Sequence, residues 1–210
     1  MNSAVEELAR PLVRVIDDDD AMRRALAFLI ESVDLPVMQY PSANHFLADP
    51  QANRPGCLVL DVRMPGMSGL ELQQVMARHE IDLPIIFLTG HADVSMVVNA
   101  MKAGAIDFIE KPFRDQALIE AVSGAVRRSC EAHAALNELR DLRRAFLDLT
   151  PREREVARLV AKGMANKLIA AELGIAEKTV HVHRANALHK MAAGSAAELA
   201  TLLIRLGEKR

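Results

Sequence analysis

Five short apolar runs in the first 120 residues constrain the fold of this chain more than any other feature. The segments between them carry apolar residues three or four positions apart, which is the spacing of amphipathic helices. Strands that alternate with helices predict a parallel sheet with helices on both of its faces. The expected strands are 12–16, 35–40, 57–62, 83–89 and 106–109, and the expected helices are 20–33, 42–49, 68–79 and 93–103. The sequence therefore predicts an α/β domain built on a doubly wound, five-stranded parallel sheet.

Polar residues follow these strands at the points where the strands end. Asp17 and Asp18 come after the first strand, Asp61 closes the third, Thr89 closes the fourth, and Lys111 follows the fifth. Ligands of open α/β sheets bind at the carboxyl ends of the strands, so these side chains are expected at one site. Adjacent carboxylates repel one another, and the simplest reason to gather them is a bound divalent cation. For the aspartate run alone, a solvated turn that caps the next helix remains the alternative interpretation.

A second module follows a long helical segment. Helical periodicity continues from 115 to 147, which would span about 50 Å, so part of this segment is expected to be a connector or a dimer seam. Four short helices follow. Thr150 is expected to cap the first and Asn166 the second, 179–191 is the third, and Ser195 opens the fourth with a second capping box. Four short helices joined by Gly-containing turns predict a helix-turn-helix domain.

The charge of the chain differs between its two halves. Residues 1–126 carry a net charge of −8, whereas residues 150–210 carry +5. An acidic module suits a cation, and a basic module suits a polyanion such as nucleic acid. Cys57 and Cys130 show neither metal-ligand spacing nor a disulfide framework. Because no secretory signal or membrane span is evident either, we expect a cytoplasmic protein without a membrane partner.

The motifs VIDDDDAM, LVLDVRMPGMSGLEL, IIFLTGHAD and AMKAGAIDFIEKPF together resemble the receiver domain of two-component response regulators. The stretch from LTPREREV to NALHKM, residues 149–191, resembles the LuxR/FixJ-type helix-turn-helix. The combination is similar to the FixJ branch of the NarL/FixJ family. This resemblance implies a flavodoxin-like receiver domain over 1–125, a linker helix over 126–148 that continues the last receiver helix, and a small all-α DNA-binding domain over 149–210.

The resemblance also assigns roles at the acidic edge of the sheet. Asp61 would be the phosphoacceptor that attacks a phosphohistidine on a sensor histidine kinase. Mg²⁺ would be held by Asp18, by Asp61 and by the backbone carbonyl of Arg63, with Asp17 acting mainly through a bound water. Lys111 would offer its ammonium to the phosphoryl oxygens, and the Lys111–Pro112 bond matches one that is usually cis in the family. Asp19 and Asp20 would begin the first helix, where negative charge suits the helix dipole.

The same resemblance implies how phosphorylation is transmitted. Thr89 would move to the phosphoryl group and Phe108 would turn inward, although Phe108 could instead be a permanent core aromatic. The region 100–104 would then support homodimerisation. The alternative output is a receiver that masks the DNA-binding domain until it is phosphorylated. Arg63 and His91 match positions that tune the lifetime of the phosphoaspartate, although His91 could be a plain loop residue.

In the basic module, the third helix is the expected recognition helix. By family position, the residues that face DNA are Thr179, His181, Val182 and Ala185, and the phosphate partners are Lys167, Lys178, Arg184 and Lys190. Two residues depart from the family pattern: Leu168 replaces a usual Glu, and Ala176 replaces a usual Ser that would cap the recognition helix. A metal site at His181 and His183 is disfavoured because positions two apart point to different faces of a helix.

The function implied is a phosphorylation-controlled regulator of transcription and not an enzyme, with RNA polymerase as a partner and activation as the family's usual output. Two other classes of protein fit the sequence less well. A phosphatase of the acid-phosphatase type uses a similar aspartate, but it usually has a second catalytic aspartate two residues on, where this chain has Arg63. A scaffold that is never phosphorylated is disfavoured by the intact Asp61, Thr89 and Lys111.

Overall fold

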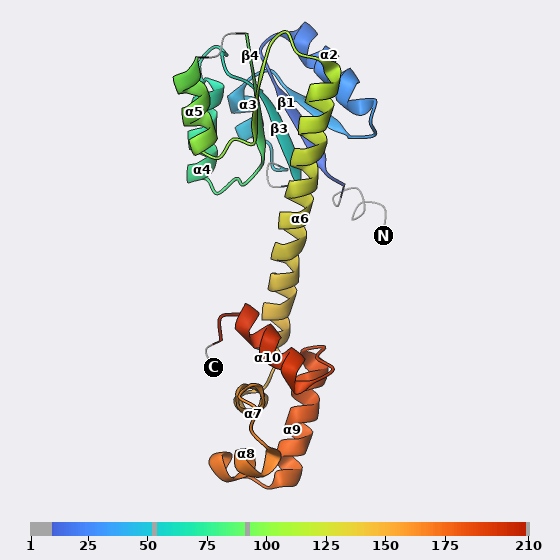
Figure 1. The fold of residues 1–210 in the computed structure, drawn as a ribbon, viewed down its shortest axis with the longest axis vertical. Coiled ribbons are helices and arrows are strands. Elements are labelled where there is room, and N and C mark those ends of the chain that lie inside the picture. The colour runs from blue at the N-terminus through green and yellow to red at the C-terminus, as the bar shows by residue number, and fades with distance from the viewer. Residues whose placement is uncertain (1–9, 52–53, 91–92, 209–210) are drawn as a thin grey trace. The chain divides into compact units, whose positions relative to one another are not determined.

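The computed structural model describes residues 10–51, 54–90 and 93–208, so His91 lies outside the described residues. The chain forms two compact units, one that ends at His133 and one that begins at Ala134. Figure 1 shows an α/β unit joined by a long helix to an all-helical unit. The helix α6 (Asp115–Leu147) runs from one unit into the other and has the 33 residues that its periodicity predicts.

The first unit is built on a five-stranded sheet in the order β2-β1-β3-β4-β5, and all four strand pairs are parallel. The strands are β1 (Leu12–Ile16), β2 (Val37–Tyr40), β3 (Gly56–Asp61), β4 (Ile85–Thr89) and β5 (Asp107–Glu110). The strand order reverses between β1 and β3, so the carboxyl ends of these two strands flank the switch point at which such sheets bind ligands. The predicted doubly wound α/β fold is confirmed.

Helices cover both faces of this sheet, as Figure 1 shows. One face packs against α3 (Ala43–Leu47), α4 (Gly69–Arg78) and α5 (Val94–Lys102), and the other packs against α2 (Asp20–Glu31) and the first part of α6. Alternate residues of each strand serve the two cores, because successive side chains of a strand point to opposite faces. In β3, for example, Leu58 and Leu60 join the first core, while Cys57 and Val59 join the second.

The second unit packs the end of α6 with α7 (Pro151–Ala161), α8 (Asn166–Leu173), α9 (Glu177–Lys190) and α10 (Ala196–Arg205). Thr150 and Glu153 form the predicted capping box at the start of α7. Val180 and Ala187 turn one side of α9 into the core, which leaves the opposite side of this helix toward solvent. The predicted four-helix organisation is confirmed, and α9 begins two residues earlier than expected.

Two predicted caps in this unit were wrong in detail. Ala165, not Asn166, is the N-cap of α8, because the Asn166 side chain instead accepts a hydrogen bond from Arg184 Nη1 at 3.0 Å. Ser195 does cap α10, but the Glu198 carboxylate accepts from the backbone N–H of Gly194 and does not close the box on Ser195.

Candidate functional site

The acidic site lies at the switch point of the sheet. Asp17 follows β1 directly and Asp61 is the last residue of β3, so the parallel pairing of these strands brings the two carboxylates to one edge. Both residues are buried, with 2 % and 8 % of their surface exposed. Gly69, the first residue of α4, lets this helix begin close against the end of β3, since a Cβ there would lie 2.4 Å from the backbone oxygen of Asp61.

Lys111 joins these two carboxylates. Its Nζ lies 2.7 Å from Asp61 Oδ1 and 2.9 Å from Asp17 Oδ2. The lysine reaches this position because its backbone N–H donates to the carbonyl of Thr89 at 2.7 Å, immediately after β5 pairs with β4. The Lys111–Pro112 bond is cis, as predicted. One ammonium between two buried carboxylates supplies the charge compensation that their burial requires.

Burial sets the protonation behaviour of this pair. Desolvation raises the pKa of Asp61 above its ordinary value, while the contacts with Lys111 oppose that rise and the Asp17 charge adds to it. Burial alone would lower the pKa of Lys111, but its hydrogen bonds to Asp61 and Asp17 outweigh that effect and raise the pKa. Lys111 therefore stays cationic at neutral pH, and Asp61 takes up a proton at a higher pH than an exposed aspartate does.

The four consecutive aspartates have different surroundings. Asp17 is buried against Lys111, whereas Asp18 is exposed. Asp19 caps α2 by accepting from the backbone N–H groups of Ala21 and Met22, and Asp20 pairs with arginines in the first turn. The predicted helix-start role of Asp19 and Asp20 is confirmed.

The oxygen atoms around the acidic site suit Mg²⁺ in chemical type, since they come from carboxylates. Within the described ranges, no three His, Cys, Asp or Glu side chains come together as a metal-binding group. Asp18 therefore does not complete a cluster with Asp17 and Asp61, and its role as a ligand stays a prediction. Asp61 Oδ2 accepts from the backbone N–H of Arg63 at 2.7 Å, which orients the carboxylate, and the Arg63 side chain is exposed.

Thr89 and Phe108 lie next to this site on adjacent strands. Thr89 is buried at the end of β4 and stands beside Glu110 in the sheet register. Phe108 is half-buried in β5, and its ring lies 5.9 Å from that of Phe87 between ring centres. It packs against the core on the α3–α5 face of the sheet. The inward movement predicted for Phe108 stays untested.

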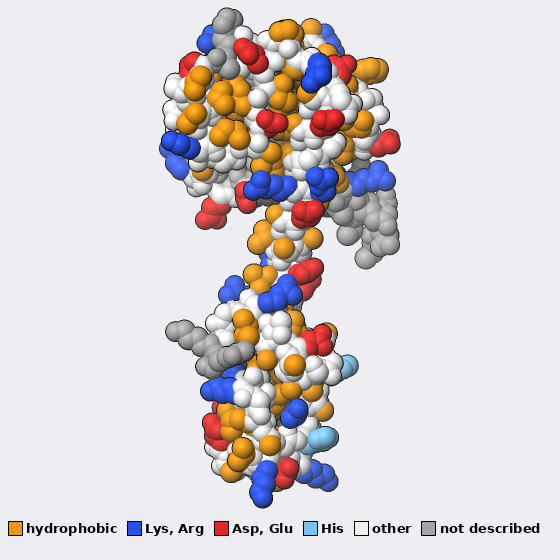
Figure 2. All heavy atoms as spheres, in the orientation of Figure 1, with side chains coloured by type: hydrophobic (Ala, Val, Ile, Leu, Met, Phe, Trp, Pro, Cys, Tyr) orange, Lys and Arg blue, Asp and Glu red, His pale blue; other side chains and the backbone are white. Residues whose placement is uncertain are grey.

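The expected recognition helix, α9, exposes the residues predicted to face DNA. Thr179, His181 and Ala185 are exposed, and Val182 is 50 % exposed although it is hydrophobic. Lys167 in α8 and Lys178 in α9 are also exposed. Figure 2 shows Lys, Arg and His side chains at the surface of this unit, with acidic groups among them.

Two predicted phosphate partners already have protein partners. The Nζ of Lys190 lies 2.7 Å from the buried Glu153 carboxylate and 3.3 Å from the carbonyl oxygen of Asp148, and it thereby ties the end of α9 to the start of α7. That contact with Lys190, together with the capping bonds to Thr150, lowers the pKa of Glu153 to about 2. Arg184 is half-buried and holds Asn166. Both side chains therefore join helices within the unit, and their contact with DNA phosphates stays a prediction.

The structure thus combines a buried acidic site in an α/β unit with a helix-turn-helix unit whose expected recognition helix is exposed. The family model for the response regulator receiver domain matches residues 13–123, and the model for bacterial regulatory proteins of the luxR family matches residues 147–203. The chain belongs to the two-component response regulators that join a receiver domain to a LuxR-type DNA-binding domain.

Known proteins resemble the chain along nearly its whole length. Nodulation protein W of Bradyrhizobium diazoefficiens is 46% identical over 202 residues, which are 96% of this chain and 89% of that protein. The transcriptional regulatory protein FixJ of Azorhizobium caulinodans is 46% identical over 195 residues, which are 93% of this chain and 92% of that protein. Among solved structures, the response regulator StyR has a TM-score of 0.88 at 44% identity and covers 94% of this chain and 100% of its own. Full-length FixJ from B. japonicum has a TM-score of 0.58 at 40% identity, with 96% and 100% covered.

Sequence reasoning placed Asp17 and Lys111 at one edge of the sheet but did not predict their direct contact, which joins positions 94 apart in the chain. It also missed one helix cap. Asp93 caps α5 by accepting from the backbone N–H of Met96, although an Asp directly before a helical pattern could have shown this.

Within the described residues, no helix is long and apolar enough to cross a membrane.

Proposed function

We propose that Asp61 accepts a phosphoryl group from the phosphohistidine of a sensor histidine kinase, and that this event controls DNA binding and transcription in the cytoplasm. The observation that carries the proposal is the position of Lys111, whose ammonium lies within 3 Å of both Asp61 and Asp17 at the sheet edge where ligands bind. A lysine on the solvated surface of a protein would not contact two buried carboxylates that stand at the ends of different strands. An anchored cation beside a carboxylate nucleophile is the arrangement that phosphoryl transfer needs.

In the proposed reaction, an oxygen of Asp61 attacks phosphorus, the bond from phosphorus to the histidine nitrogen breaks, and the imidazole leaves with that electron pair. Lys111 then exchanges part of its contact with Asp61 for the phosphoryl oxygens. Mg²⁺ held by Asp18, by Asp61 and by the carbonyl of Arg63, with Asp17 acting mainly through a bound water, would neutralise charge on those oxygens. The backbone N–H of Arg63 keeps Asp61 oriented during the attack, because it already donates to Oδ2.

The added group carries a charge of about −1.5 to −2 and three acceptor oxygens, which is a large local change in a buried site. Thr89, buried at the end of β4, is the hydroxyl proposed to respond, and Phe108 on the adjacent strand would follow it. These movements would change how β5 and α5 pack. The added charge would thereby favour one of two arrangements of this part of the receiver domain over the other. Because Phe108 is half-buried, an inward turn would bury more of its ring.

We further propose that phosphorylation promotes a homodimer through the α5 side of the receiver domain. Hydrophobic residues at one helical spacing are exposed along α5: Val94 is 81 %, Val98 is 42 % and Met101 is 42 % exposed. Figure 2 shows hydrophobic side chains at the surface on this side of the α/β unit. An apolar stripe of this kind, continuous with the predicted region 100–104, supports an interface with a second copy.

DNA binding is proposed to place the exposed side of α9 in the major groove. Thr179, His181, Val182 and Ala185 would meet base edges, and Lys167 and Lys178 would meet phosphates. The N-caps of α8 and α9 are both alanines, so neither cap residue supplies a side-chain acceptor for the first backbone N–H groups of its helix. DNA phosphates would accept from them, as anions do at helix N-termini. Activation through RNA polymerase is the output proposed for the bound dimer.

The test combines mass, oligomeric state and DNA binding. The full chain is treated with beryllium fluoride and Mg²⁺, which mimic phosphorylation, and is then measured by light scattering and by selection of bound genomic fragments. We expect a dimer and enriched DNA fragments for the wild type, and a monomer with weak binding for Asp61→Asn. An unchanged mass together with enhanced DNA binding would favour release of a masked domain. DNA binding that is the same with and without the mimic would contradict the proposal.

A further inference from the structure

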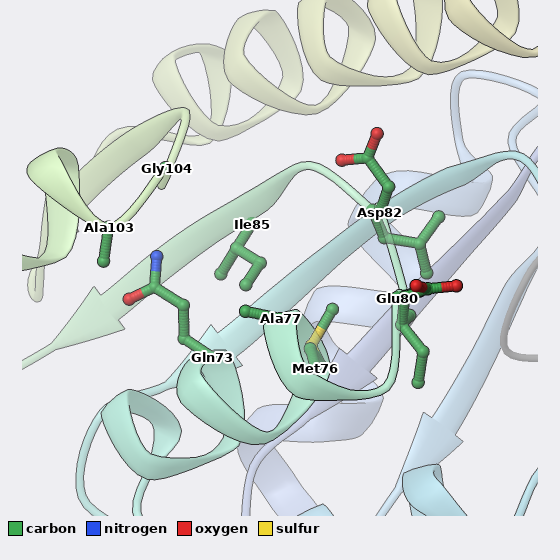
Figure 3. A pocket seen from close by; sticks show the side chains of 10 residues that line it. Gln73, Met76, Ala77, Glu80, Asp82, Ile85, Ala103 and Gly104 are labelled. Atoms are coloured by element: carbon green, nitrogen blue, oxygen red, sulfur yellow. The ribbon is translucent and has the colours of Figure 1, made fainter.

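A hollow of about 360 Å³ lies at the amino-terminal edge of the sheet, at the opposite end of the strands from Asp61. Figure 3 shows that its walls come from α4, from the loop that leads into β4, from β4 itself and from the segment after α5. A volume of this size is within the range that small-molecule ligands occupy. The phosphoryl chemistry proposed above uses none of the residues that line it.

The lining of the hollow is mostly apolar. Met76, Leu83 and Ile85 form a buried floor, and Ala77, Ile81 and Ala103 add apolar side chains that are exposed or half-buried. At one end stands the buried amide of Gln73, whose Nε2 donates to the carbonyl of Ala100 at 3.1 Å and so links α4 to α5. Figure 3 shows this amide rising from α4 toward the segment after α5. A ligand here would therefore cover apolar side chains and meet one fixed polar group.

The other end of the hollow carries negative charge. Glu80 and Asp82 stand on the loop between α4 and β4, and both are exposed (Figure 3). Across the residues that the structure describes, neither carboxylate forms an ion pair. A cation bound there would give both carboxylates a partner.

Two helices reinforce this negative potential. α4 ends at Arg78 and α5 ends at Lys102, and the segments that follow both helices line the hollow. The C-terminal end of a helix carries partial negative charge. Arg78 and Lys102 are the nearest basic groups in the sequence, but neither lines the hollow, and Arg78 Nε turns back toward the carbonyl of Gln74 at 3.4 Å. The charged residues that line the hollow are both acidic, which favours a positive ligand over an anion.

We propose that this hollow binds a small amphipathic cation, namely a primary amine carried on an apolar body such as an aryl or branched alkyl group. The apolar body covers Ala77, Ile81 and Ala103, which line the hollow and are not buried, and the ammonium meets Glu80 and Asp82. A bare metal ion would leave the apolar floor in contact with water, and a neutral ligand would leave the two carboxylates without a partner. An amine on an apolar body satisfies both ends at once.

The probe for this proposal is phenethylamine, titrated into ¹⁵N-labelled full-length protein and followed by NMR. The expected result is a saturable shift of the backbone signals of Leu83 and Ile85 and of the Gln73 side-chain amide. The matched neutral probe is 2-phenylethanol, which keeps the ring and removes the charge. We expect it to bind at least about tenfold more weakly, and we expect added salt to weaken only the amine.

The variants separate this site from non-specific binding. The double variant Glu80→Gln, Asp82→Asn keeps the shape of both side chains and should weaken the amine by tenfold or more. The control variant Glu120→Gln removes one exposed carboxylate on α6, away from the hollow, and should leave binding unchanged. Equal binding of the alcohol and the amine, unchanged affinity in the double variant, or shifts that lie outside the hollow would each overturn the proposal. The unchanged NMR spectrum of the double variant in the absence of probe verifies its fold.

Discussion

Lys111→Met should make the acidic site bind Mg²⁺ more tightly, although it removes the group proposed to contact the phosphoryl oxygens. In the structure, the Lys111 ammonium contacts Asp61 at 2.7 Å and Asp17 at 2.9 Å, so it already compensates the charge that a metal ion would compensate. A metal that binds at Asp61 has to compete with this contact. Methionine keeps most of the length and the apolar stem of lysine, so the substitution removes the charge without opening a large cavity.

The magnitude follows from the contact that is lost. A hydrogen bond to a charged group contributes about 1.5–3 kcal/mol to stability. The Lys111 side chain is 20% exposed, so solvent screens the pair only in part and the lower end of this range applies. About 1.5 kcal/mol corresponds to roughly a tenfold change in an equilibrium constant. We therefore expect the dissociation constant for Mg²⁺ to fall by about tenfold in the variant.

Isothermal titration calorimetry at pH 8 and constant ionic strength measures this change. The control is Lys102→Met, which removes an equal charge from the exposed surface of α5 and should leave Mg²⁺ affinity within about twofold. If Lys111→Met binds Mg²⁺ as weakly as the wild type does, or more weakly, then the ammonium does not compete with the metal and the reasoning fails.

The remaining predictions concern stability. Glu153→Gln should lower the stability of the C-terminal unit by about 1 kcal/mol or more near neutral pH, because it weakens a capping box and the ion pair with Lys190. Since the pKa of Glu153 is lowered from 4.5 to about 2, the difference in stability between the variant and the wild type should be complete above pH 4.5 and should vanish as the pH falls through 2. A difference in melting temperature that stays constant over this pH range would contradict the prediction. Ala176→Ser should raise the melting temperature of the same unit by supplying the missing cap of α9, worth about 0.5–1 kcal/mol; a lower melting temperature would oppose this account. Arg14→Ala should lower the free energy of unfolding of the receiver domain in urea by about 3 kcal/mol or more. The substitution removes a wholly buried guanidinium that donates to three backbone carbonyls. A loss below about 1 kcal/mol would show that these bonds contribute little.

The strands and helices followed from the sequence because their signals are local. Alternating apolar runs and helical spacing placed the five strands, and the uninterrupted pattern from 115 to 147 predicted α6 at its full length. The cap of α7 also followed, because Thr150 and Glu153 have the spacing of a capping box, and the contact of Glu153 with Lys190 leaves that box intact.

Long-range partners explain what the sequence could not show. Asn166 is a good N-cap by type, but Arg184 on α9 takes its side chain, so the cap falls to Ala165. Lys190 was predicted as a partner of DNA phosphates, yet its ammonium pairs with Glu153, 37 positions away. These contacts depend on how helices pack, which residue spacing within one helix does not determine.

The candidate acidic site was only half predictable for a similar reason. The topology of a parallel sheet fixes which strand ends meet, so Asp17, Asp61, Thr89 and Lys111 were correctly expected at one edge. The division of labour between Asp17 and Asp18 depends instead on the direction in which each side chain leaves the backbone after β1. The structure buries Asp17 against Lys111 and leaves Asp18 exposed.

The most direct measurement is the intact mass of the full chain after incubation with acetyl phosphate and Mg²⁺, followed by peptide mapping of the modified residue. The wild type should gain the mass of one phosphoryl group on Asp61, and Asp61→Asn should gain none. A wild-type protein that stays unmodified while Mg²⁺ is bound, or that carries the group on another residue, would contradict the central role given to Asp61.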